Sequence, residues 1–313
     1  MKNILIVGGA GFIGSNLCDS YIREGHRVTV LDNLCTGSKH NLDGVSASRN
    51  FAFLEGDVCE LLPEFEETFD YVFHLASPAS PPKYMALAVE TMMSNSVGTK
   101  NLLDYCTSSG ARLLFTSTSE VYGDPTVSPQ SESYWGNVNP TGPRSTYDES
   151  KRFGEALISE YQRSKGVSAV IVRLFNTYGP KMDPFDGRVV SNFIRQTIEG
   201  SNLTVYGDGS QTRSFCYVSD TVRGLKMAME SNELGPLNIG NPTEMTLLEL
   251  AAIIGKTLGK APLIEFDDLP TDDPKQRKPD ISLAQAKLNW NPTVALDEGI
   301  KLTYDWMKGE LQQ

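Results

Sequence analysis

The sequence predicts an α/β fold, in which a doubly wound parallel sheet is followed by a smaller C-terminal lobe. Short runs rich in Val, Ile, Leu and Phe alternate with amphipathic helical patterns through the N-terminal half. After about residue 176 the local composition of the sequence changes, and Gly, Pro, Asp and Asn become frequent. We therefore expect a sheet domain at residues 1–175 and a lobe at 176–313, with segments of about 215–240 returning to the sheet.

Each expected element has its own local pattern. Six apolar runs are expected to be strands buried on both faces, at residues 4–7, 27–31, 51–54, 71–75, 112–116 and 169–174. Helical patterns lie between the strands, at residues 14–24 and 90–107. In the second region we expect helices at residues 189–199, 249–258, 282–288 and 297–306. Residues 215–230 and 236–239 are expected to rejoin the sheet.

Composition narrows the class of protein. The chain has 313 residues, 40% of them hydrophobic, and a formal net charge of −11, which argues against nucleic-acid binding. The apolar run at residues 4–7 is cut short by glycines, so we expect neither a signal peptide nor a membrane span. The five cysteines are odd in number and scattered, which predicts a reducing, cytoplasmic compartment. The three histidines are isolated, so we expect no metal site.

A glycine-rich turn follows the first expected strand and opens a helix. Its glycines are Gly8, Gly11 and Gly14, with Phe12 and Ile13 between the last two. Glycines at these places permit a tight turn and bring backbone N–H groups and a helix N-terminus close to a pyrophosphate. The turn therefore predicts a dinucleotide-binding (Rossmann) domain, although its spacing differs by one residue from the commonest fingerprint.

Asp32 ends the second expected strand and selects the cofactor. Its carboxylate suits the adenosine ribose hydroxyls and would repel a 2′-phosphate, which favours NAD over NADP. A plain turn aspartate is the alternative interpretation. Further cofactor contacts are expected in the loops after neighbouring strands, at Asn33, Thr36, Gly37, Asp57, Val58, Leu75 and Ser77.

Tyr147 and Lys151 stand four residues apart, on one face of an expected helix. A neighbouring ammonium favours the phenolate and lowers the pKa of a phenol. Beside a bound nicotinamide, the pair is typical of a general base for a substrate hydroxyl. Alone, the spacing occurs by chance on many helices, so its meaning depends on the glycine turn.

Together with Thr118, these motifs resemble the extended short-chain dehydrogenase/reductase superfamily, which modifies nucleotide sugars. Within it, the chain is most similar to the UDP-glucuronate decarboxylase (UDP-xylose synthase) family, from about residue 2 to 306. The matching segments are residues 74–82, 117–125, 134–140, 187–193, 203–207, 209–213 and 277–280.

The resemblance implies a reaction. NAD oxidises C4 of UDP-glucuronate, the resulting β-keto acid loses CO₂, and C4 is reduced again to give UDP-xylose, with the cofactor regenerated in each turnover. It makes Tyr147 the acid and base, Lys151 its activator and a nicotinamide ribose contact, and Thr118 a hydrogen-bond partner of the sugar. Glu120 and Arg277 fall at positions that the family uses for turnover, with Arg277 binding the substrate carboxylate. The remaining substrate contacts implied are Asn176, Arg188, Tyr206 and Arg213.

Ser119 separates the competing functions. Nucleotide-sugar 4,6-dehydratases usually carry an aspartate at this position to protonate a leaving hydroxyl, whereas a decarboxylase needs no such acid. Epimerases share Tyr147 and Lys151 but usually lack a glutamate at the position of Glu120. The alternatives are thus a 4,6-dehydratase or 4-epimerase and, from another class, a non-catalytic NAD-binding regulator. The superfamily commonly forms homodimers through two helices, here residues 90–107 and the helix that carries Tyr147.

Overall fold

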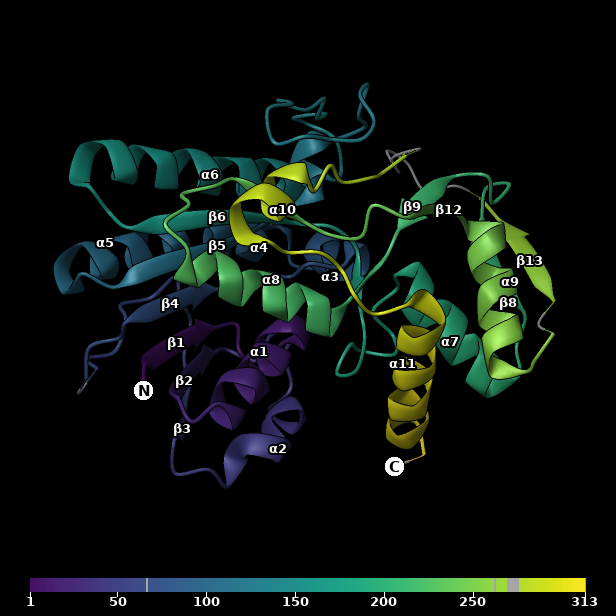
Figure 1. Ribbon diagram of the computed structural model, residues 1–313, viewed down its shortest axis with the longest axis horizontal. Coiled ribbons are helices and arrows are strands. Elements are labelled where there is room, and N and C mark those ends of the chain that lie inside the picture. Colours follow the sequence, from purple (N-terminus) through teal and green to yellow (C-terminus); the bar gives the residue numbers. More distant parts are fainter. Residues whose placement is uncertain (66, 262, 269–275, 313) are drawn as a thin grey trace.

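The computed structural model describes residues 1–65, 67–261, 263–268 and 276–312. Within these residues, the centre of the protein is a seven-stranded sheet in which every pairing is parallel (Figure 1). Its strands are β1 (Asn3–Val7), β2 (Arg27–Asp32), β3 (Phe51–Glu55), β4 (Tyr71–His74), β5 (Arg112–Thr118), β6 (Ala169–Leu174) and β11 (Leu237–Ile239). The order across the sheet is β11-β6-β5-β4-β1-β2-β3. The predicted doubly wound sheet is confirmed, and the strand order reverses between β1 and β4, where such sheets bind ligands.

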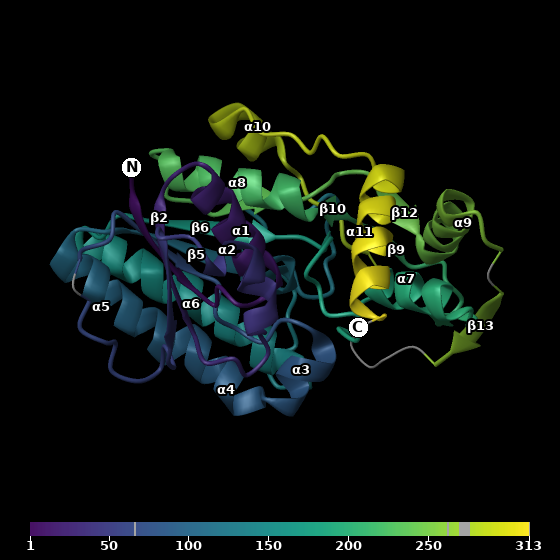
Figure 2. The same cartoon turned by 90° about the horizontal axis from the view of Figure 1, so that it is seen from below.

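The helices cover both faces of the sheet because successive strand residues point to opposite sides. In β1, Ile4 and Ile6 pack into one buried cluster, and Leu5 and Val7 pack into the other. The first cluster is closed by α1 (Phe12–Arg23) and α8 (Val218–Glu230), and the second by α5 (Thr99–Ser109) and α6 (Ser145–Lys165) (Figures 1 and 2). Shorter helices α2 (Asp43–Ser46) and α3 (Pro81–Ala86) follow β2 and β4 along the chain.

Two expectations for this half are corrected. β3 is half-exposed rather than buried on both faces, because it forms the edge of the sheet. The helix expected at residues 90–107 is α4 (Ala88–Met93) and α5, joined by one π-helical turn at Ser94–Gly98. In that turn, Ser94 and Asn95 point inward, where Ser94 donates to the Ala76 carbonyl and Asn95 donates to Ser150.

The lobe consists of three strand pairs and three helices within the described residues. The pairs are β7 (Thr177–Tyr178) with β10 (Cys216–Tyr217), β8 (Leu203–Tyr206) with β13 (Ile264–Asp267), and β9 (Thr212–Ser214) with β12 (Glu244–Thr246). The helices α7 (Val189–Glu199), α9 (Leu247–Leu258) and α11 (Leu296–Glu310) pack against one another. In Figure 1 they form the smaller mass beside the sheet.

The chain passes between the two halves several times. The segment expected to rejoin the sheet at residues 215–230 instead pairs its short strand β10 with β7, and only α8 packs on the sheet. The strand β11 does join the sheet edge, beside β6. The helix α10 (Ser282–Leu288) packs against α8 and β11, although it lies far along the chain. The limits 1–175 and 176–313 therefore stay a prediction.

Candidate active site

The glycine turn combines tight packing with one open position. Gly8 has φ +83°, and a Cβ there would lie 2.5 Å from the Ala76 nitrogen. A Cβ on Gly14 would lie 2.3 Å from the Gly8 oxygen. A Cβ on Gly11 would meet only the Gly8 oxygen, at 3.3 Å, and Gly11 lines the cavity. The turn thus leaves space against the N-terminus of α1, which fits the diphosphate of a dinucleotide.

Asp32 ties this turn to the end of β2. Its buried carboxylate accepts hydrogen bonds from the Ala10 nitrogen, at 2.9 Å, and from the Leu34 nitrogen, at 2.8 Å. Burial raises the pKa of Asp32 in spite of these bonds. Each carboxylate oxygen can accept a second hydrogen bond, so a ribose contact remains compatible with this arrangement.

A cavity of about 730 Å³ lies between the sheet and the lobe. Most of the predicted cofactor residues line it: Gly8, Gly11, Phe12, Ile13, Gly14, Thr36, Gly37, Leu75, Ser77, Tyr147 and Lys151. Four do not: Asp32, Asn33, Asp57 and Val58. Asn33 and Asp57 are hydrogen-bonded to each other at 2.9 Å, and the buried Val58 packs against Gly98.

The residues predicted for chemistry and substrate binding all line the same cavity: Thr118, Ser119, Glu120, Asn176, Arg188, Tyr206, Arg213 and Arg277. They come from strand ends of the sheet and from separate segments of the lobe. The structure therefore brings together residues that lie up to 159 positions apart, from Thr118 to Arg277.

Tyr147 and Lys151 are buried in the first half of α6. The Lys151 amine donates to the Thr116 carbonyl at 2.7 Å and lies 5.8 Å from the centre of the Tyr147 ring. Burial raises the pKa of the Tyr147 phenol, an effect that the nearby Glu120 strengthens and a hydrogen bond with Thr118 opposes. Burial also lowers the pKa of the Lys151 amine to about 7. The structure therefore does not show the expected lowering of the Tyr147 pKa by Lys151. Desolvation raises the pKa of the phenol, and by lowering the pKa of Lys151 it also reduces the fraction of Lys151 that is charged.

Thr118 and Ser119 stand where β5 ends. The Thr118 hydroxyl accepts from the Glu120 nitrogen at 3.2 Å and begins a single 3₁₀ turn, Ser119–Tyr122. Ser119 is buried in this turn. The turn holds the side chains of Thr118, Ser119 and Glu120 at the carboxyl edge of the sheet, in the cavity that Tyr147 also lines.

Glu120 lies between two arginines. Arg277 binds both of its carboxylate oxygens, one at 3.0 Å, and Arg144 binds one of them at 2.7 Å. Burial alone would raise the pKa of Glu120, but Arg277 and Arg144 outweigh burial and hold it well below its usual range. The binding of a substrate carboxylate by Arg277 stays a prediction, and Arg277 lines the cavity while it holds Glu120.

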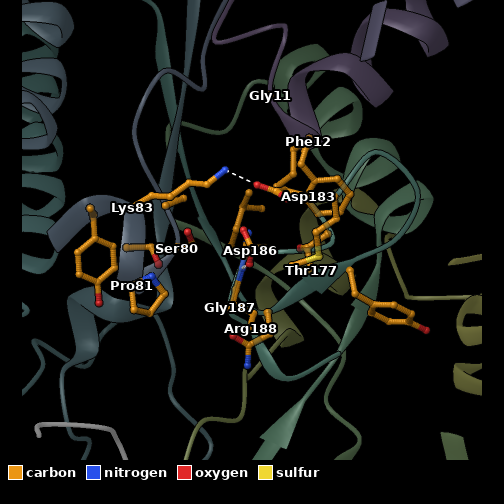
Figure 3. Close-up of a pocket in the computed structure, with 18 of the residues that line it drawn as sticks. Gly11, Phe12, Ser80, Pro81, Lys83, Thr177, Asp183, Asp186, Gly187 and Arg188 are labelled. Atoms are coloured by element: carbon orange, nitrogen blue, oxygen red, sulfur yellow. Dashed lines mark hydrogen bonds and ion pairs between the residues drawn. The ribbon is translucent and has the colours of Figure 1, made fainter. Parts of the chain in front are cut away.

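A segment of the lobe, residues 179–188, crosses the cavity, and we call it the strap. On one side, Asp183 of the strap binds the amine of Lys83 at 2.7 Å (Figure 3). On the other, Lys181 binds Asp19 of α1 at 2.7 Å. Arg188, at the end of the strap, is paired with Asp186 and lies close enough to Tyr147 to act on its pKa. The strap thus links α1 and α3, and all three contribute residues to the lining of the cavity.

Sequence reasoning missed several of these residues. Tyr84 stacks on Tyr147 with ring centres 5.0 Å apart and planes 3° from parallel, and it is buried. Its only signal was its place directly after the proline-rich segment 74–82. Arg144, Lys83 and Asp183 had no signal, because each has its partner in a distant part of the chain.

Two further properties of the described segments bear on partners. None of their helices combines the length and the apolar character that a bilayer crossing requires. In those same segments, no three His, Cys, Asp or Glu side chains gather closely enough to hold a metal ion.

Comparison with known proteins identifies the family. Residues 4–240 match the model of the NAD dependent epimerase/dehydratase family. The chain belongs to this family. Family members share the fold and the cofactor: a UDP-glucuronic acid 4-epimerase from Bacillus cereus, solved with UDP-glucuronic acid and NAD, matches with a TM-score of 0.86 and 30% identity over 98% of this chain and 99% of that one. A dTDP-glucose 4,6-dehydratase from Streptomyces venezuelae, solved with NAD, matches with a TM-score of 0.89 and 27% identity over 99% and 98%.

Curated members of the family are more similar in sequence. UDP-glucuronic acid decarboxylase 1 of Xenopus tropicalis is 50% identical over 99% of this chain and 73% of its own length. UDP-glucuronic acid decarboxylase 6 of Arabidopsis thaliana is 52% identical over 96% of this chain and 87% of its own length. The resemblance inferred from the motifs is confirmed, as is the choice of NAD as the cofactor.

Proposed function

We propose that the chain converts UDP-glucuronate to UDP-xylose and CO₂, with NAD as a bound cofactor. The observation that carries this proposal is a guanidinium fork in the cavity that also holds Tyr147: Arg277 lines this cavity and binds both carboxylate oxygens of Glu120. A planar fork of this kind also matches the carboxylate that a uronic acid sugar carries. The decarboxylases at 50% and 52% identity support the same conclusion.

The residues suit each step of the reaction. Bound NAD supplies the acceptor, and later the donor, of the hydride at C4. Tyr147 takes the proton of the C4 hydroxyl as a phenolate and returns it at the end, and a protonated Lys151 favours the phenolate at the start and at the end of the turnover, when Tyr147 holds no proton. The C4 ketone is adjacent to C5, so the electrons of the C5–C6 bond can move into it as CO₂ leaves. The enolate that forms then takes a proton at C5, from a water that Glu120 would orient, before the hydride returns to C4.

Charge then develops on the C4 oxygen. We infer that the hydroxyl groups of Tyr147 and Thr118 donate hydrogen bonds to that oxygen. Both side chains are buried, which would strengthen these bonds. Ser119 is a poor acid, so the same site does not favour loss of water from C6. The serine therefore supports decarboxylation over the 4,6-dehydratase reaction.

We also propose that the protein is a homodimer. The helices α4 and α6 pack side by side and expose apolar side chains next to one another: Val89, Met92 and Met93 on α4, and Phe153 on α6. A second copy would cover this surface through the same helices. Light scattering after size-exclusion chromatography measures the mass, and a monomer at micromolar concentration contradicts the proposal.

A reducing, cytoplasmic compartment is part of the proposal. The five cysteines, Cys18, Cys35, Cys59, Cys106 and Cys216, are all free thiols. Burial raises the pKa of the Cys106 and Cys216 thiols to about 12, so neither is suited to act as a nucleophile.

One incubation tests the activity. UDP-glucuronate and NAD are added to the purified protein, and the sugar nucleotide is analysed by mass spectrometry and chromatography. Loss of the mass of CO₂ supports the proposal. A parallel incubation with UDP-glucose, which has a hydroxyl at C6, tests the dehydratase: loss of the mass of water from that sugar indicates it. Conversion of UDP-glucuronate to an isomer of unchanged mass indicates an epimerase.

A further inference from the structure

Gln130 lies in the long loop that joins the Ser119–Tyr122 turn to α6, and no part of the proposed reaction yet uses it. The residue is 0% exposed, although glutamine is a polar side chain and the four residues before it are exposed. Burial of a polar side chain is costly unless its hydrogen-bonding groups are satisfied. The partners of Gln130 therefore indicate what this position holds in place.

Gln130 binds the segment that follows Arg277. Its backbone N–H donates to the Lys278 carbonyl at 2.8 Å, and its backbone carbonyl accepts from the Asp280 N–H at 2.9 Å. Its side-chain oxygen, Oε1, accepts from the Lys278 N–H at 2.8 Å. The side-chain Nε2 donates to the Val127 carbonyl at 2.7 Å, which fixes the orientation of the amide. Both backbone groups of Lys278 are thus held by one residue of the loop.

The Lys278 N–H belongs to the peptide group that joins Lys278 to Arg277. Because this group is planar, its hydrogen bond to Gln130 fixes the direction in which the chain leaves the Cα of Arg277. The Arg277 side chain is 4% exposed, lines the cavity and binds both oxygens of Glu120. A loop residue therefore fixes the backbone beside a guanidinium group of the candidate site.

We propose that Gln130 is a positioning residue for Arg277 and, through Arg277, for the carboxylate of the sugar. This inference rests on the proposed function. A guanidinium fork binds both oxygens of a carboxylate only when the two planes align, so a small displacement of its backbone weakens the pair. Gln130 itself does not line the cavity, so its effect on the ligand passes through Arg277.

Loss of the Gln130 side chain leaves the Lys278 N–H without its acceptor. The peptide group then turns toward water or another acceptor, and the fork of Arg277 moves with it. Binding of UDP-glucuronate weakens for this reason, whereas UDP-glucose, which has no carboxylate, does not need the fork. Loss of one hydrogen bond that stabilises the bound arrangement corresponds to roughly a tenfold change in affinity.

Glu132 provides a matched control in the same loop. Its carboxylate accepts from the Asn238 N–H at 2.8 Å, so Glu132→Met also removes a side-chain acceptor from a backbone N–H. That N–H lies on β11 and not beside Arg277. Glu132→Met should therefore lower the Tm without changing the preference between the two ligands.

The test measures dissociation constants for UDP-glucuronate and UDP-glucose by calorimetry on NAD-loaded protein. Every protein carries Tyr147→Phe, so that UDP-glucuronate is not consumed during the titration. We expect Gln130→Met to weaken UDP-glucuronate binding by roughly tenfold, with UDP-glucose changed by less than about threefold. In proteins that also carry Arg277→Met, adding Gln130→Met should change UDP-glucuronate binding by less than about threefold, because two changes that act through one contact are not additive.

A second variant tests the same contact without an unpaired N–H. Gln130→Glu keeps an acceptor for the Lys278 N–H and loses the donor to Val127, so it should keep the preference for UDP-glucuronate to within about threefold. This variant is informative even where Gln130→Met does not fold. Thermal unfolding and NAD content show whether each protein is folded.

Several outcomes overturn the inference. Equal weakening of both ligands in Gln130→Met, or the same loss of preference in Glu132→Met, means that Gln130 only supports the loop. An undiminished effect beside Arg277→Met means that Gln130 does not act through Arg277. Unchanged affinity in Gln130→Met, or a preference lost in Gln130→Glu, means that the side-chain oxygen does not position the fork. A parent protein that does not prefer UDP-glucuronate over UDP-glucose contradicts the proposed function and the inference with it, so the two failures are distinguishable.

Discussion

Replacing Gly11 by alanine separates the cofactor role of the glycine turn from its structural role. Gly11 has φ −77° and ψ 178°, a conformation open to any residue, and its added Cβ would meet one atom at 3.3 Å. The change should therefore alter the free energy of unfolding by less than about 0.5 kcal/mol. The methyl group would occupy the space in which a phosphate oxygen must approach the backbone to about 2.9 Å. We expect NAD affinity to fall by at least about tenfold, or ~1.4 kcal/mol.

Gly14→Ala is the matched control. Its Cβ would lie 2.3 Å from the Gly8 oxygen and 2.7 Å from the Gly9 Cα, and backbone atoms cannot rotate away. The expected cost is about 3 kcal/mol. That cost corresponds to a fall in Tm of roughly 4–5 °C for a chain of this size. NAD titration calorimetry and thermal unfolding, both on protein freed of nucleotide, measure the two effects. Unchanged NAD affinity in Gly11→Ala, or an unchanged Tm in Gly14→Ala, would refute this account of the turn.

Four other changes test separate parts of the structure. Tyr147→Phe removes the hydroxyl that exchanges the C4 proton, so we expect turnover to fall by about a thousandfold with NAD still bound, as kinetics and nucleotide content will show. Lys83→Met removes the ion pair that joins the strap to α3; a half-exposed pair of this kind is worth up to about 1 kcal/mol, so NAD should dissociate a few-fold faster in stopped-flow chase experiments. The control variant Lys100→Met removes a surface ion pair and should leave the rate of NAD dissociation unchanged. The pKa of Lys151 is about 7 in the folded protein and near 10.4 in the unfolded chain, so between these pH values the unfolded chain binds more protons and the stability of the fold rises with pH. From pH 7 to 10, the Tm of the wild type should therefore rise relative to the Tm of Lys151→Met. Asp220→Asn weakens the buried carboxylate that accepts two backbone N–H groups at 2.8 and 2.9 Å, at a cost of about 2 kcal/mol in urea unfolding; unchanged stability would contradict its role as an anchor.

Local pattern was sufficient for much of the fold. The apolar runs lie within one or two residues of the observed strands, and the helices predicted at 189–199 and 282–288 match α7 and α10. The prediction failed where inward polar contacts decide the backbone. Ser94 and Asn95 look like ordinary helix residues, and their partners in other elements favour a π turn that no helical period reveals.

The candidate site divides in the same way. Tyr147 and Lys151 could be predicted because their geometry is fixed by one helix. The Glu120–Arg144–Arg277 cluster joins three elements, and its ion pairs depend on how the lobe packs against the sheet. No spacing in the sequence carries that information, so the ion pairs of Glu120 with Arg144 and Arg277 could not be predicted.

The repeated passage of the chain between the two halves has a mechanical consequence. The polypeptide leaves the sheet half after β6, returns at α8, leaves again after β11, returns at α10 and leaves once more for α11. Several backbone connections, not a single hinge, therefore join the parts that enclose the cavity. A body held at several points can rock through only a small angle, so opening is expected to resemble a shallow shear, with ligand exchange governed by the loops at the rim.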